Sequence, residues 1–178
     1  MDYRSLGPDD APLVEELFRS VFTESAGEQE GALVGRLAGE LLACVGSHDV
    51  CGFAAVDRNR IVGAIFFSRL TFDPPREAFL LSPVAVRSDQ QGRGIGQELI
   101  AHGLGGLARR GVSLVATYGD PAFYGKVGFA PISPEAIRPP HALSRPEGWL
   151  GQCLAGDALQ AVTGRCFCVK AFDDPALW

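Results

Sequence analysis

Hydrophobic residues repeat at two different periods along the chain, and the change of period separates the helices from the strands that we expect. Apolar side chains three and four residues apart predict a helix that begins near Pro8 and contains residues 13–22. The same spacing predicts a second helix over residues 33–42. The polar stretch between them, residues 23–31, is expected to be a loop. A short strand at residues 3–6 is expected to precede this helix pair.

Short apolar runs replace the helical period beyond residue 50. Residues 50–56 and 61–70 are rich in β-branched and aromatic side chains and predict a hairpin. Asn59 suits a left-handed conformation in the turn between them. Pro83 cannot donate a ladder hydrogen bond, so the strand that contains it should be bulged or unpartnered there. Further strands are expected at residues 78–86 and 112–117, from residue 129, and at residues 165–172.

The second half of the chain alternates strands with helices. A long helix is expected over residues 94–110, because Gly111 follows two arginines that suit a helix C-terminus. Asp120 followed by Pro121 favours the start of a short helix over residues 122–127. Residues 133–148 are expected to be irregular and residues 157–162 to form a helical turn. This order of elements predicts a mixed α/β sheet, in a single domain over residues 1–178.

The charge balance argues against one class of partner. The 178 residues contain 16 Lys and Arg and 21 Asp and Glu, a net charge of −5, whereas general nucleic-acid binding requires many phosphates to be neutralised at once. We expect no nucleic-acid partner, although backbone amides and one arginine could still form a local phosphate site. The five scattered cysteines and the absence of a signal-like start favour a cytoplasmic protein. No apolar run has membrane-spanning length, so no membrane partner is expected. The oligomeric state stays open.

The most informative segment is a strand that runs through a glycine-rich turn directly into a helix. Gly92, Gly94 and Gly96 allow close approach of the backbone to a ligand, and the first N–H groups of the helix favour an anion there. A Walker loop would require Lys and then Ser or Thr, where this chain has Gln97 and Glu98. The glycine spacing also differs from the Rossmann fingerprint, which disfavours a dinucleotide-binding oxidoreductase. From these residues alone, a flexible glycine turn remains the alternative.

Two motifs together resemble one enzyme family. Gln91-Gly-Arg-Gly-Ile-Gly96 resembles the Gln/Arg-x-x-Gly-x-Gly/Ala acyl-CoA loop of the GNAT N-acetyltransferase superfamily. Residues 119–129 resemble its second motif, a tyrosine followed four residues later by Gly-Phe, with a Gly-Asp-Pro lead-in similar to that of a bacterial branch. The strong resemblance covers residues 78–131. It implies a GNAT-like α/β fold with a mixed, mostly antiparallel central sheet flanked by helices, and acetyl-CoA as co-substrate.

The resemblance also implies roles for individual residues. Tyr124 would be catalytic, as the general acid for the thioester sulfur. At position 117 many relatives have Asn, which contacts pantetheine, and Thr117 reaches less far. The strand backbone would bind pantetheine and the loop amides would bind pyrophosphate. The implied cofactor-binding residues are Val84, Ala85, Val86, Gln91, Gly92, Arg93, Gly94, Ile95, Gly96, Gln97 and Thr117.

The function implied is an acyltransferase that moves an acetyl group from acetyl-CoA to a primary amine by direct attack on the thioester. A catalytically silent acyl-CoA-binding regulatory module is the alternative, and an acyl group other than acetyl stays open. Glu77 is the nearest candidate base in sequence, against a solvated charge beside Arg76, and a water relay would need no dedicated residue.

The acceptor is expected to be a small-molecule or peptide amine. Two surfaces could contact it: the acidic stretch that holds Glu24, Glu28 and Glu30, and the Pro-rich segment 132–148 with Trp149 just beyond it. His48, His102 and His141 show no ligand spacing, so no metal is expected. Cys166 and Cys168 are interpreted as core packing.

Overall fold

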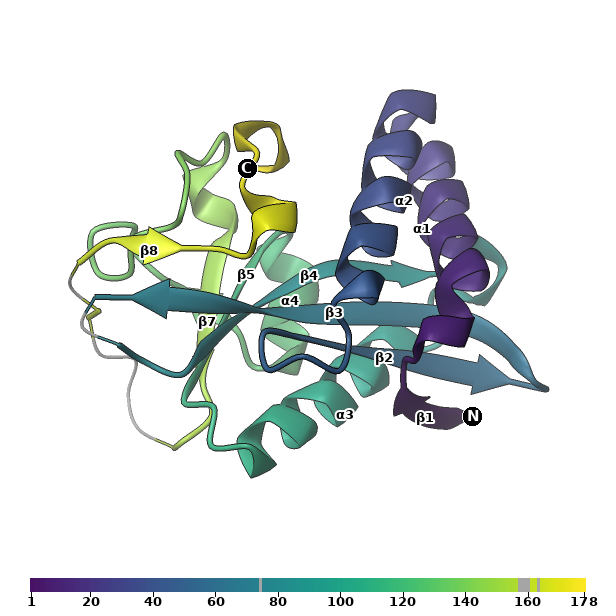
Figure 1. The fold of residues 1–178 in the computed structure, drawn as a ribbon, viewed down its shortest axis with the longest axis horizontal. Coiled ribbons are helices and arrows are strands. Elements are labelled where there is room, and N and C mark those ends of the chain that lie inside the picture. Colours follow the sequence, from purple (N-terminus) through teal and green to yellow (C-terminus); the bar gives the residue numbers. More distant parts are fainter. Residues whose placement is uncertain (74, 157–160, 163) are drawn as a thin grey trace. The chain divides into compact units, whose positions relative to one another are not determined.

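The structure, a computed structural model, describes residues 1–73, 75–156, 161–162 and 164–178 and divides them between two compact units. The first unit consists of residues 1–67 and 83–103, and the second of residues 68–82 and 104–178. Strands β3 and β4 and helix α3 each run from one unit into the other (Figure 1). The elements are β1 Asp2–Ser5, α1 Ala11–Ala26, α2 Glu28–Ala43, β2 Val50–Asp57, β3 Arg60–Phe72, β4 Ala78–Val86, α3 Ile95–Arg109, β5 Leu114–Tyr118, α4 Pro121–Tyr124, β6 Ala130–Pro131, β7 Trp149–Cys153 and β8 Cys166–Phe167.

Strands of the first unit follow one another in the order β1-β2-β3-β4. β1 pairs antiparallel with β2, from Asp2 opposite Val56 to Ser5 opposite Phe53. The β2–β3 turn contains two left-handed residues, Arg58 at φ 46° and Asn59 at φ 64°. Two such residues are the requirement of a type I′ turn. The predicted hairpin is confirmed.

The two N-terminal helices are longer than the sequence predicted, and the loop expected over residues 23–31 is wrong. α1 continues to Ala26, Gly27 turns the chain with a φ of 98°, and α2 begins at Glu28. The polar residues that suggested a loop lie at the ends of both helices. The helices pack closely, because a Cβ atom on Gly31 of α2 would lie 1.9 Å from Oγ1 of Thr23 on α1. Figure 1 shows α1 and α2 side by side.

A hydrophobic core lies between this helix pair and the strands of the same unit. Phe18 of α1 and Phe66 of β3 are both fully buried, with ring centroids 5.8 Å apart. Val14 and Leu17 on α1, and Leu37 and Leu41 on α2, are buried beside them. The helical stripes read from the sequence are therefore the core-facing sides.

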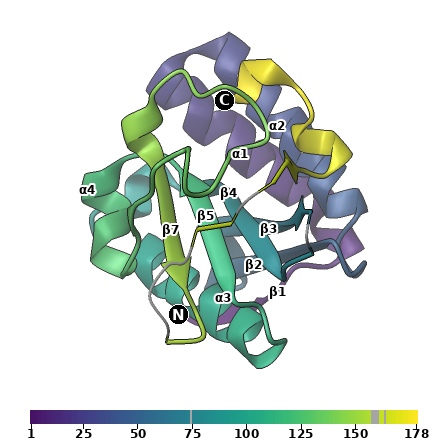
Figure 2. The same ribbon diagram turned by 90° about the vertical axis from the view of Figure 1, so that its left-hand side faces the viewer.

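Strands of the second unit follow the order β3-β4-β5-β7-β6, and β8 pairs with the end of β3. β4 and β5 are parallel, whereas β5–β7 and β6–β7 are antiparallel (Figure 2). With helices against mostly antiparallel strands, the predicted fold class is confirmed.

The C-terminal part differs from the sequence prediction. β7 was not expected, and Trp149, its first residue, is fully buried with Nε1 donating to the Ile137 carbonyl at 2.9 Å. The expectation that Trp149 offers an aromatic contact to an acceptor is therefore wrong. The strand expected over residues 165–172 shrinks to β8, followed by a 3₁₀ turn at Lys170–Phe172. The helical turn expected over residues 157–162 falls largely on 157–160, outside the described residues. Among the described residues, no helix is long and apolar enough to cross a membrane.

Candidate active site

The loop between β4 and α3 has the backbone geometry of an anion-binding turn. After β4, a 3₁₀ turn at Ser88–Gln90 leads into Gly92 at φ 74° and Gly94 at φ 81°. These left-handed conformations explain why glycine stands at both positions. Nε2 of Gln91 donates to the Val86 carbonyl at 2.9 Å and ties the loop back to its strand. The loop is therefore held at a defined place beside the start of α3.

Unpaired backbone amides point out of the start of α3. The first hydrogen bond of the helix runs from N of Glu98 to O of Gly94 at 3.0 Å. The N–H groups of residues 95–97 precede it and have no acceptor within the helix. A Cβ atom on Gly92 or Gly94 would meet nothing within 4 Å, so the surface in front of the loop is open. Together with the positive end of the helix dipole, these amides favour a phosphate group there.

Beyond its pairing with β5, β4 alternates half-buried and buried side chains. Val84 and Val86 are half-buried, whereas Ala85 between them is 2% exposed. Ala85 therefore contributes only its backbone at the predicted cofactor position. The pairing with β5 ends at Leu81 opposite Thr117, although β4 continues to Val86. Pro83 lies just beyond that last pair, as its lack of an N–H donor predicts.

Thr117 and Tyr124, the predicted site residues of the second unit, interact with each other. Thr117 is fully buried and donates its hydroxyl proton to the Leu81 carbonyl at 2.8 Å. Its side chain also interacts with Tyr124, and this interaction lowers the pKa of the Tyr124 phenol. Burial raises the pKa of the Tyr124 phenol, and the nearby negative charge of Asp120 raises it as well.

The short helix that carries Tyr124 is built as the sequence predicted, with an additional contact that it did not reveal. The Asp120 carboxylate accepts from N of Ala122 at 2.8 Å and caps the helix, and Gly128 ends it at φ 94°. The Tyr124 ring makes an edge contact with Phe129, centroids 5.8 Å apart. A Cβ atom on Gly119 would lie 2.6 Å from the Tyr124 ring. The glycine of the Gly-Asp-Pro lead-in thus makes room for the tyrosine.

The structure disfavours Glu77 as a base. Its carboxylate is 2.7 Å from Nη1 of Arg69 and its side chain is 58% exposed. The carboxylate is therefore engaged by Arg69 and open to solvent, and it is not enclosed in a site. Glu77 serves its strand instead through its carbonyl, which accepts from N of Ser113 at 3.1 Å.

A cavity of about 650 Å³ lies within the first unit, and one of the three predicted acidic residues lines it. Glu24 contributes its carboxylate, which accepts from the Ser88 hydroxyl and so joins the end of α1 to the loop after β4. Glu28 and Glu30 lie in the first turn of α2 and are absent from the lining. The other charged lining residues are Glu16, Arg60, Arg87 and Asp89. Arg87 and Asp89 form an ion pair at 3.0 Å, which lowers the pKa of Asp89.

The mixed sheet, the glycine turn before α3 and the capped tyrosine helix are the features that the resemblance to GNAT acetyltransferases implies. Residues 48–131 match the family model of the Acetyltransferase (GNAT) domain, which confirms the resemblance seen in the sequence. Over this stretch the chain is therefore similar to GNAT acetyltransferases.

Individual relatives agree with this family. The chain is 29% identical over 165 residues to the uncharacterized N-acetyltransferase YhbS of Escherichia coli K12, covering 88% of this chain and 89% of that protein. A crystal structure of E. coli YhbS in complex with CoA is similar with a TM-score of 0.79 at 27% identity, covering 97% and 92% of the two chains. A GNAT family acetyltransferase from Brucella melitensis, solved with acetyl-CoA, shares the fold with a TM-score of 0.71 at 24% identity over 97% of each chain.

Proposed function

We propose that this protein transfers an acetyl group from acetyl-CoA to a primary amine by direct attack on the thioester. The observation that carries the proposal is the β4–α3 turn, where two left-handed glycines precede three helical N–H groups that have no intrahelical acceptor. Supported by the similarity to GNAT acetyltransferases, this turn would bind the pyrophosphate of acetyl-CoA through residues 91–97. The backbone of Val84, Ala85 and Val86 would bind the pantetheine arm, with Thr117 as a further contact.

Tyr124 would supply the proton that the leaving group needs. The amine nitrogen attacks the thioester carbonyl carbon, a tetrahedral oxyanion forms, and the C–S bond then breaks. The departing thiolate, whose conjugate thiol has a pKa of about 8.5, takes the phenolic proton of Tyr124, which solvent then replaces. Because burial raises the pKa of Tyr124, the phenol is protonated near neutral pH and available as a donor.

The amine must lose its own proton without help from Glu77, which is bound to Arg69. We favour loss to water. This route suits an α-amino group, with a pKa of about 7.7–8.0, better than a lysine-like amine at about 10.4.

We propose the cavity of the first unit as the place where the acceptor amine enters. Glu24 contributes a carboxylate whose contact there is a neutral hydroxyl, that of Ser88. A negative charge at a cavity mouth concentrates a cationic amine. Glu28 and Glu30, which do not line the cavity, would contribute little beyond net charge.

We also propose that the chain forms one domain and works in the cytoplasm. β3, β4 and α3 each belong to both compact units, so neither unit is a contiguous stretch of chain. The five cysteines are free thiols, as is usual in a reducing compartment.

The decisive experiment is CoA release from acetyl-CoA with a panel of amines, run beside a binding measurement for acetyl-CoA and for NAD. We expect acetyl-CoA to bind, NAD not to bind, and at least one amine to accelerate CoA release. Binding without any accelerated release would instead indicate a silent acyl-CoA-binding module. Binding of neither nucleotide would contradict the assignment of the β4–α3 turn.

A further inference from the structure

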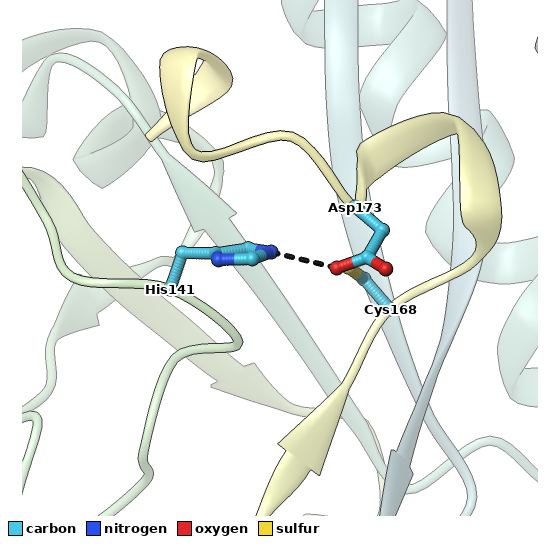
Figure 3. Close-up of side chains that lie close together, drawn as sticks. All are labelled: His141, Cys168 and Asp173. Atoms are coloured by element: carbon cyan, nitrogen blue, oxygen red, sulfur yellow. Dashed lines mark hydrogen bonds and ion pairs between the residues drawn. The ribbon is translucent and has the colours of Figure 1, made fainter.

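Three side chains that favour transition metals meet in the second unit. They are His141, from the irregular segment after β6, Cys168, just after β8, and Asp173, after the following 3₁₀ turn. Nε2 of His141 lies 3.0 Å from Oδ1 of Asp173, and the nitrogen, sulfur and carboxylate oxygen all lie within 4.8 Å of one another. Figure 3 shows the imidazole directed at the carboxylate, with the Cys168 side chain beside it.

The surrounding structure brings these side chains together. The 3₁₀ turn at Lys170–Phe172, with N of Asp173 bonded to O of Lys170 at 3.1 Å, folds Asp173 back toward Cys168. The His141 ring packs on Trp178, centroids 6.1 Å apart, and Trp178 is 7% exposed. The chain just after His141 is held as well, because N of Arg145 donates to the Tyr118 hydroxyl at 2.7 Å. The imidazole is therefore packed on Trp178 and comes from a segment that is anchored on its C-terminal side.

We propose that His141, Cys168 and Asp173 bind one divalent metal ion of the zinc type. One imidazole, one thiolate and one carboxylate form a mixed N, S, O donor set that suits Zn²⁺ or Co²⁺ rather than Mg²⁺ or Ca²⁺. Bonds of about 2.0–2.3 Å to a tetrahedral centre put ligand atoms about 3.5 Å apart. The ligand atoms now lie within 4.8 Å of one another, so side-chain rotations that move them by about 1 Å reach that geometry.

The charges balance when the metal is bound. Burial and the charge of Asp173 together raise the pKa of the Cys168 thiol to about 11, so the metal-free side chain is a thiol. Binding exchanges the thiol proton for the metal ion and releases that proton to solvent. A neutral imidazole then binds through Nε2 and carries its proton on Nδ1. Thiolate and carboxylate together neutralise the two positive charges, which leaves solvent as the fourth ligand.

Such an ion would cross-link two segments of the chain that have little regular structure. The segment after β6 and the segment after β8 contain short 3₁₀ turns but, among the described residues, no helix of the α type. A metal that binds the native arrangement and not the unfolded one stabilises it by mass action. The site is thus proposed as structural and independent of acetyl transfer. Neither β4 nor Tyr124 contributes to it.

The test uses the full chain without an affinity tag, first stripped with a chelator. Co²⁺ and Zn²⁺ are titrated while thiolate-to-cobalt absorption and the fluorescence of Trp178 are followed. We expect one ion per chain, a charge-transfer band, and a higher thermal midpoint with Zn²⁺. Removal of an outer partner alone costs about 10–100-fold in metal affinity, so Cys168→Ser, His141→Gln and Asp173→Asn should each cost at least as much.

Cys44→Ser is the matched control, because Cys44 is an exposed free thiol of the first unit. It should bind metal as the natural protein does. Asp173, whose side chain is 68% exposed, provides a ligand that can be changed without opening the core. Equal affinity in Asp173→Asn and Cys44→Ser would overturn the site, and so would a natural protein that binds no Zn²⁺ at tens of micromolar.

Discussion

Tyr124 shows how a single residue can be prepared for one chemical task. Burial and the nearby charge of Asp120 raise the pKa of its phenol, while Thr117, whose hydroxyl donates to the Leu81 carbonyl, lowers it. Gly119 leaves the space that the ring occupies. A phenol with a raised pKa keeps its proton until a stronger acceptor arrives.

Replacing Tyr124 by Phe should therefore lower turnover far more than it weakens acetyl-CoA binding. General-acid catalysis is typically worth about 10²–10⁴-fold in rate, and we expect a loss in that range in the steady-state kcat. Tyr3→Phe is the control, because Tyr3 also has a raised pKa, about 12, through burial and Glu98 in the first unit. Unchanged kcat in Tyr124→Phe would reduce Tyr124 to a packing residue.

Asp10 makes a residue-scale contribution to stability that depends on pH. Arg4 donates two hydrogen bonds of 2.7 Å to the Asp10 carboxylate, and N of Gly7 donates a third at 2.9 Å. The Arg4 bonds lower the pKa of Asp10 against the opposing effect of burial. The folded state thus favours the charged form. The resulting stability is present above the unfolded pKa of about 3.9 and is lost as pH falls through the lower folded pKa.

Asp10→Asn should cost about 1 kcal/mol of unfolding free energy at pH 7, a modest value because the Arg4 side chain is 47% exposed. The cost should shrink once the pH is below the folded pKa of Asp10, as measured by denaturant titrations at several pH values. Asp9→Asn, in the same turn but exposed, should change little. A cost that stays constant from neutral to acid pH would show that the charge of Asp10 is irrelevant.

At the scale of elements, the β4–α3 turn combines two requirements in one residue. Gly94 needs a left-handed backbone and leaves open space before the helix amides. Asn and Asp both tolerate that backbone, and they differ in charge but hardly in size.

Gly94→Asp should therefore weaken acetyl-CoA binding by more than about tenfold relative to Gly94→Asn. A tenfold difference corresponds to about 1.4 kcal/mol, and repulsion between the Asp carboxylate and the phosphates costs more than that. Calorimetry at low and high salt measures the difference, which should narrow at high salt. Equal affinities for the two variants would mean that the phosphates bind elsewhere.

Helix α3 contains glycines with opposite expected responses to the same substitution. A Cβ atom on Gly103 would lie 2.4 Å from the fully buried Phe67 ring, whereas on Gly105 its nearest contact is Arg109 Nη1 at 3.6 Å. Gly103→Ala should destabilise by about 1–3 kcal/mol. Gly105→Ala should stabilise by up to about 1 kcal/mol. The midpoints of denaturant unfolding of the two variants measure these changes in stability. Changes of the same sign in both variants would contradict this account of the packing.

The sequence predicted elements well where local signals bounded them. β4 and α3 match their expected ranges because prolines precede the strand, and glycine turns lie at the ends of both. β7 was missed because its five residues have no periodicity, and they become a strand through pairing with β5, a partner distant in sequence. The supposed loop at residues 23–31 failed for another reason: one left-handed glycine at position 27 suffices to turn the chain between two helices.

Across the whole molecule, the net charge of −5 says less about the site than the positions of individual charged residues do. Motif spacing found the glycine turn and Tyr124. It could not find the cavity or the His141 cluster, because segments far apart in sequence build them. Of the three glutamates considered for the acceptor, Glu24 alone lines the cavity.

Glu24→Gln should raise the acceptor KM and weaken its dependence on salt while acetyl-CoA affinity stays the same. The double variant Glu28→Gln with Glu30→Gln changes more net charge and should have the smaller effect on KM. Initial rates at low and high ionic strength make the comparison once an amine is known. A larger effect from the double variant would mean that net charge, and not the cavity, attracts the amine.

The interleaving of the two units constrains how the chain can be assembled during synthesis. The first unit needs residues 83–103 beside residues 1–67, and the second needs residues 68–82 together with the C-terminal stretch from residue 104. A ribosome therefore releases β3 and β4 before their outer partners in the second unit exist, since β8, which pairs with β3, and β5, which pairs with β4, come later. The halves of β3 and β4 that belong to the second unit are apolar. Their residues Leu70, Phe72, Phe79 and Leu80 are buried in the folded protein. Until β5 and β8 are synthesised, each of these strands has one open edge, so we expect the nascent chain to be prone to aggregation at this stage.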